Sequence, residues 1–125
     1  MGNNTIIFTG TTFGILAIIL GAFGAHALKK VLSTEKLASF EVGVRYQMYN
    51  ALFLLLLGFN TNTTISNIKW AFYLVTTGTI LFSFSIYLLA LAEPLKKNFR
   101  FLGPVTPLGG LLMILGWGSL LATLL

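Results

Sequence analysis

Four apolar stretches, separated by short polar segments, constrain this chain more than any other feature. They run over about residues 6–28, 42–60, 68–92 and 102–125. A bilayer's hydrocarbon core is about 30 Å thick, and a helix needs about 20 apolar residues to cross it. Only 9% of the residues are charged, whereas a soluble domain carries about 25%. The sequence therefore predicts an all-α integral membrane protein, with residues 1–125 forming one domain of four transmembrane helices in a compact bundle.

Polar side chains run directly into the second apolar stretch. Arg45, Gln47 and Asn50 precede the apolar segment 51–59 without a turn, and the next polar run begins at Asn60. As a helix, the roughly 14 residues between Arg45 and Asn60 cover about 21 Å, which is less than the thickness of the hydrocarbon core. We therefore expect polar groups of this segment to lie at the membrane's edge or deeper, with the charged end on the cytoplasmic side.

The second span is expected to belong to a longer helix. Ser33 or Thr34 is a suitable cap for its start, with Glu35 in the first turn, and no proline interrupts the chain before the next polar loop. The first two turns are amphipathic and are predicted to lie at the membrane interface. Glu41 and Arg45 are four residues apart, in the favourable order for an intrahelical ion pair.

Small residues recur at helical spacing in the first and last spans. Such spacing places them on one face, where a neighbouring helix can approach closely. Self-association into a homo-oligomer through these faces is therefore predicted. The candidate helix-packing positions are Gly10, Gly14, Gly21, Gly109 and Gly116.

Hydroxyl side chains gather on one face of the third span. Thr76, Thr79, Ser83 and Tyr87 share this face, with Ser85 elsewhere. Hydroxyl groups of this kind hydrogen-bond across to another membrane helix, and we expect that role here. Prolines mark the boundaries of the last two spans: Pro94 as the break after the third, and Pro104 and Pro107 in the first turns of the fourth.

Lysine and arginine are confined almost entirely to one side of the four spans. Seven of the eight lie in segments 29–45 and 93–100, and only Lys69 lies in the loop between the second and third spans. Cytoplasmic loops of membrane proteins carry an excess of these residues. Both basic loops are therefore predicted to be cytoplasmic and both termini outside. Membrane topology also accounts for the net charge of +5, so no nucleic-acid partner is expected.

The inventory of reactive side chains is short. The chain has no Cys and no Asp, three Glu and one histidine, His26. A zinc site normally needs three or four converging ligands, and coupled transport generally relies on ionisable groups near the middle of a span. Neither pattern is present, so no catalytic residue, metal site or cofactor is predicted.

One group of polar residues is expected at similar depth near the cytoplasmic ends of the spans, and it has two interpretations. Arg45 could face inward with Glu41, His26 or Glu93 to form a polar pocket. Alternatively, Arg45 could snorkel to lipid phosphates while Tyr46 and Tyr49 anchor the interface. We favour a buried network that ties the helices together. The candidate polar cluster, or lipid site, comprises His26, Glu41, Arg45, Gln47, Tyr49, Asn50 and Glu93.

Four segments of the chain resemble signature segments of a known family. They are Gly21 to His26, Val44 to Leu52, Phe82 to Leu91 and Gly103 to Gly110, in the same order along the chain. On these residues, the chain resembles the family catalogued as domain of unknown function 423. The resemblance implies a bacterial inner-membrane protein with four spans, and implies no activity. The family pattern often has histidine where this chain has Asn50, so no titrating group is expected there.

These observations predict a non-enzymatic protein with a structural or membrane-homeostasis role. Its polar cluster would lock the bundle or bind an anionic lipid head group, and membrane lipids are the expected partners. Two other functions stay open at this point. One is a small oligomeric transporter or channel with a path lined by Thr76, Ser83, Tyr87 and the Arg45 cluster. The other is an accessory subunit of a larger membrane complex, whose protein partner the sequence does not identify.

Overall fold

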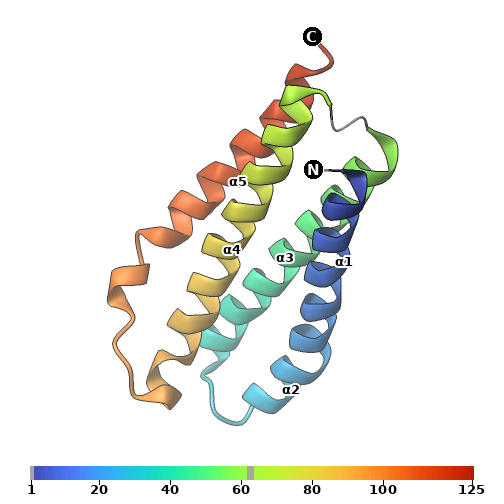
Figure 1. Cartoon of the computed structure of the whole chain (residues 1–125). Coiled ribbons are helices and arrows are strands. Elements are labelled where there is room, and N and C mark those ends of the chain that lie inside the picture. Colours follow the sequence, from blue (N-terminus) through green and yellow to red (C-terminus); the bar gives the residue numbers. More distant parts are fainter. Residues whose placement is uncertain (1, 62–63) are drawn as a thin grey trace.

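Helices account for all the regular secondary structure in the described part of the chain, residues 2–61 and 64–125 of a computed structural model (Figure 1). Asn62 and Thr63, in the predicted polar loop, lie outside the described residues. In chain order the elements are α1 (Asn3–Ile19), the π-helical turn η1 (Leu20–Gly24), α2 (Ala25–Leu28), α3 (Thr34–Asn60), α4 (Ser66–Leu95), the 3₁₀ turn η2 (Arg100–Leu102) and α5 (Val105–Ala122).

Four of these helical segments are long and apolar enough to cross a membrane. They are Asn3–Leu28, Thr34–Asn60, Ser66–Leu95 and Arg100–Ala122, with mean hydropathies of 2.2, 1.2, 1.9 and 1.6 over their most apolar windows. The prediction of an all-α protein with four spanning helices is therefore confirmed.

Helix α3 begins as its sequence predicts. The Ser33 side chain accepts a hydrogen bond from the backbone N–H of Lys36 at 3.2 Å, and Glu35 lies in the first turn. The helix then continues without interruption to Asn60, so the amphipathic extension and the span form one element.

Two other spans differ from expectation, α4 at its end and the first span within its length. Pro94 lies inside α4, and the helix ends one residue later because Lys96 adopts the left-handed conformation, with φ 54° and ψ 41°. A proline so close to the end of a helix removes only one backbone donor. In the first span, the π-helical turn Leu20–Gly24 interrupts a helix that the sequence predicts to be continuous.

The helices pack side by side in the order α1, α3, α4, α5, so that α3 and α4 form the inner pair and α1 and α5 flank them (Figure 1). Both termini lie near the same end of the bundle as the α3–α4 connection. The α2–α3 and α4–α5 connections, which hold the basic segments, lie at the opposite end.

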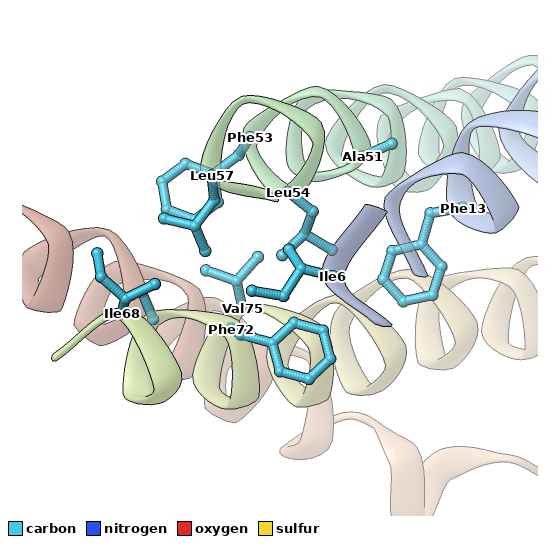
Figure 2. Close-up of a cluster of buried hydrophobic side chains, with 10 residues drawn as sticks. Ile6, Phe13, Ala51, Phe53, Leu54, Leu57, Ile68, Phe72 and Val75 are labelled. Carbon is cyan, nitrogen blue, oxygen red and sulfur yellow. The ribbon is translucent and has the colours of Figure 1, made fainter. Parts of the chain in front are cut away.

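Two apolar clusters fill the interior. The one nearer the termini draws on α1, α3 and α4, and Ile6 and Leu54 at its centre are both 0% exposed (Figure 2). The second cluster lies nearer the basic end and is built around Phe40 and Tyr87, whose ring centroids are 5.0 Å apart.

Close helix contacts depend on glycine at several of the predicted packing positions. A Cβ atom at Gly109 would lie 2.5 Å from the Phe82 backbone nitrogen, and one at Gly116 would lie 2.9 Å from the Val75 nitrogen. At Gly10 it would lie 2.9 Å from the Ala51 carbonyl oxygen.

Gly14 and Gly21 make looser contacts, where a Cβ atom would lie 3.8 and 3.1 Å from side-chain atoms of α3. All five glycines thus face helices of their own chain. Self-association stays a prediction, but these faces are already covered within one chain, so it would need another surface.

Replacing Gly109 by leucine should destabilise the bundle. The new side chain would meet backbone atoms of Phe82 that cannot rotate away, and overpacking of this kind costs about 1–3 kcal/mol. Gly118→Leu on the same helix is the matched control, since a Cβ atom at Gly118 meets nothing within 4 Å. Unfolding titrations in mixed micelles with dodecyl sulfate measure both variants. Equal stability of the two would contradict the packing described here.

Candidate functional site

The predicted polar cluster divides between two faces of α3. Gln47 is 0% exposed and Asn50 is 3% exposed, so both amides lie in the interior. Glu41, Arg45 and Tyr49 are exposed and follow one another at four-residue spacing on the outward face. Because residues four apart share a helix face, the charged side chains of Glu41 and Arg45 do not meet the two amides.

The remaining members of the predicted cluster also lie on the surface. His26 at the end of α2 and Glu93 at the end of α4 are both exposed. Within residues 2–61 and 64–125, Arg45 makes no ion pair, and the predicted Glu41–Arg45 pair is not formed. Both side chains point away from the helices that could have buried them, and exposed pairs of this type contribute little stability. The inward-facing charged pocket is therefore not formed.

Gln47 connects three helices by hydrogen bonds. Its Nε2 atom donates to the Phe13 carbonyl oxygen of α1 at 2.9 Å, and its Oε1 atom accepts from the Tyr87 hydroxyl of α4 at 2.7 Å. A buried amide without such partners would cost free energy in an apolar environment. Gln47 therefore ties α1, α3 and α4 together at one level of the bundle.

A second tie between α3 and α4 lies one turn away. The Ser83 hydroxyl donates to the Gly43 carbonyl oxygen at 2.8 Å. A Cβ atom at Gly43 would lie 2.7 Å from Tyr87 Cε1, so the absence of a side chain lets the tyrosine ring reach Gln47. The sequence indicates the hydroxyl face of α4 but gives no sign of this requirement at Gly43.

Helix α5 is attached through a different amide. The Trp117 indole Nε1 donates to Asn50 Oδ1 at 3.1 Å, and Asn50 Nδ2 lies 2.7 Å from the Met113 sulfur. Ser85, expected away from the hydroxyl face, is buried and shares a hydrogen bond with Thr106 of α5. These contacts were not predicted, because the rotation of α5 about its axis depends on packing that its apolar sequence does not encode.

One predicted hydroxyl has a different environment. The Thr76 Oγ1 atom is buried and, within the described residues, makes no hydrogen bond. The Thr79 hydroxyl is satisfied within its own helix by the Val75 carbonyl oxygen at 2.7 Å. The hydroxyl face of α4 therefore ties helices together through Ser83 and Tyr87 only.

A cleft lies between α3 and α5 and consists of two hollows. The first, of about 510 Å³, also has Phe82 of α4 in its lining. A second hollow of about 540 Å³ continues it toward the termini, and the two share Tyr49 and Trp117 in their walls. Sequence reasoning missed this feature. The residues that line the first hollow are Tyr46, Tyr49, Asn50, Phe82, Gly110, Met113, Ile114 and Trp117.

The described residues contain no group of three or more His, Cys, Asp or Glu side chains placed to hold a metal ion. What the interior offers instead is hydrogen bonding by neutral amide and hydroxyl groups. Such groups hold helices together and orient weakly polar ligands, and they carry no charge at neutral pH.

The fold and its apolar helices define the class of this protein as a multi-span α-helical membrane protein. The family described as Protein of unknown function (DUF423) matches residues 20–110. The chain belongs to this family, and the resemblance of its four segments is confirmed. The family is described as of unknown function, and bacterial relatives of the chain are named as membrane proteins.

Staphylococcal relatives cover most of the chain. A UPF0382 membrane protein of Staphylococcus haemolyticus is 41% identical over 111 residues, which are 89% of this chain and 87% of that protein. A UPF0382 membrane protein of Staphylococcus epidermidis has the same identity and coverage, and one of Staphylococcus aureus is 40% identical over the same share. No solved structure matches the chain.

Proposed function

We propose that this protein has a non-enzymatic, structural or membrane-homeostasis role in which it holds anionic phospholipids at the cytoplasmic face of the membrane. The observation that carries the proposal is the exposure of Arg45 on a spanning helix and its lack of an ion-pair partner within the described residues.

The depth of Arg45 explains why a lipid phosphate suits it. Arg45 is 15 residues before Asn60, the end of α3, which corresponds to about 22 Å along the helix. If Asn60 marks the outer edge of a hydrocarbon core of about 30 Å, Arg45 lies about one and a half turns inside the inner edge. An arginine at such a position extends its side chain to the nearest head groups.

Neighbouring side chains support the same interpretation. Tyr46 is 42% exposed beside Arg45, and tyrosine is enriched at membrane interfaces. Seven of the eight lysines and arginines lie toward this end of the bundle. We propose that this end is cytoplasmic and that the termini are outside, since cytoplasmic loops carry the excess of basic residues.

A transport path is less well supported. Of the hydroxyl groups proposed to line it, those of Ser83 and Tyr87 are buried and bonded to groups of the same chain. That of Thr76 is buried and makes no hydrogen bond within the described residues. Arg45 lies on the opposite face of α3 from Gln47, to which Tyr87 is bonded. The residues of the predicted path therefore do not share a common surface.

Native mass spectrometry tests the lipid site. Protein released from mild detergent should retain an anionic phospholipid, and Arg45→Gln should lose most of it while remaining folded, because the exposed guanidinium has no structural partner. Lys69→Gln, which removes a positive charge from the start of α4 near the other end of the bundle, is the matched control and should retain the lipid. Unchanged retention in Arg45→Gln would refute the site. Loss of folding in that variant would show that Arg45 is instead a structural lock.

Cysteine labelling tests the orientation, because the chain contains no cysteine of its own. Ser66→Cys and Asn98→Cys place one exposed thiol at each end of the bundle. A membrane-impermeant maleimide should label Ser66→Cys in intact cells and Asn98→Cys only after permeabilisation. The reverse pattern would show that the basic end faces outward.

A further inference from the structure

The side chains that line the cleft between α3 and α5 differ along its length. Aromatic rings line the first hollow, and one buried amide lies in its wall. The second hollow is lined mostly by apolar side chains, among them Leu52, Leu56 and Leu120. Leu52 and Leu56 are 51% and 66% exposed, so the cleft opens sideways toward lipid. Along the bundle, a hollow with a buried amide in its wall is therefore followed by a hollow with mostly apolar walls.

The amide of Asn50 is incompletely bonded. It carries two N–H donors, and within the described residues the acceptor given for its nitrogen is the Met113 sulfur. A thioether is a weak acceptor. The Asn50 oxygen is already occupied by the Trp117 indole N–H, which fixes the amide's orientation. The group that a ligand would need at this position is therefore an acceptor such as a carbonyl oxygen.

The depth of the amide decides which acceptor can reach it. Asn50 is ten residues from Asn60 at the end of α3, or about 15 Å along the helix. Met113 is the ninth of the 18 residues of α5. Both therefore lie near the middle of a hydrocarbon core of about 30 Å. A phospholipid carries its phosphate and ester groups at the interface, so its acceptors do not reach this level.

From these observations we propose that the cleft binds a neutral, membrane-dissolved molecule with a flat carbonyl-bearing ring and a hydrocarbon tail, the chemistry of an isoprenoid quinone. The ring carbonyl accepts a hydrogen bond from Asn50 Nδ2. The ring lies among Tyr46, Phe82 and Trp117, since flat rings pack favourably against aromatic side chains. The tail occupies the second, apolar hollow toward Asn60. This site does not involve Arg45, and the proposal stands independently of anionic lipid binding.

Quenching of tryptophan fluorescence tests the proposal in detergent-solubilised protein. The chain has two tryptophans, so Trp70→Phe leaves Trp117, in the cleft wall, as the single reporter. A decyl-tailed benzoquinone should quench Trp117 saturably. In the same background, Asn50→Leu should weaken binding between about threefold and tenfold, the equivalent of one lost hydrogen bond.

A second variant keeps the test decisive if Asn50→Leu fails to fold. Gly110 lines the cleft, and a Cβ atom there would lie 3.8 Å from Phe82, an ordinary contact. Gly110→Leu should therefore fill the cleft without disturbing the helices and should abolish saturable quenching. Gly118→Leu on the same helix, where an added Cβ atom meets nothing within 4 Å, should bind normally.

Three results would overturn the proposal. The first is quenching that rises linearly with quinone concentration and is the same in Gly110→Leu, which indicates partitioning into the micelle only. The second is equal competition by decylbenzene, which has the ring and tail but no carbonyl group. The third is equal competition by phosphatidylglycerol, which would assign the cleft to phospholipid acyl chains. Displacement by a second tailed quinone but by neither of these competitors is the expected result.

Discussion

An amide side chain in the middle of an apolar bundle must find hydrogen-bond partners inside the protein, and the arrangement of the helices depends on this constraint. Lipid offers no donor or acceptor at the depth of Gln47. Its partners come from α1 and α4, at Phe13 and Tyr87. Because each bond requires a particular rotation of the partner helix, the position of α3 fixes those of its two neighbours. Asn50 does the same for α5 through Trp117.

Glycine makes these bonds geometrically possible. Polar side chains reach across only where helix backbones approach closely, and small residues allow that approach in membranes, where burial of apolar surface provides no driving force. Gly43 leaves room for the Tyr87 ring, while Gly10 and Gly109 bring α1 and α5 onto the inner pair. Arg45 is exposed on a face of α3 that no helix of the described residues covers, the position from which we propose that it reaches a lipid phosphate. The cleft lies where α5, which packs along α4, meets α3 through a few side chains, with Trp117 against Asn50 and Phe53.

Most of the fold could be predicted from sequence, because long apolar stretches have few alternatives in a membrane. The four spans, the Ser33 cap and the role of Ser83 and Tyr87 follow from hydropathy and helical spacing. The division of the polar cluster could not be predicted, since it depends on how α3 is rotated. Hydropathy is nearly uniform around α5, so nothing in its sequence indicated that Trp117 and Met113 would face Asn50. The π-helical turn Leu20–Gly24 likewise had no signal in its composition.

The coupling between Gln47 and Tyr87 tests the central claim most directly. A double-mutant cycle with Gln47→Met and Tyr87→Phe, followed by reversible unfolding in mixed micelles, measures the free energy that the two side chains share. The account predicts a favourable coupling of about 0.6 to 1.7 kcal/mol, the average and the largest value known for hydrogen bonds between membrane helices. Additive losses, with no coupling beyond experimental error, would show that this bond does not hold α3 and α4 together.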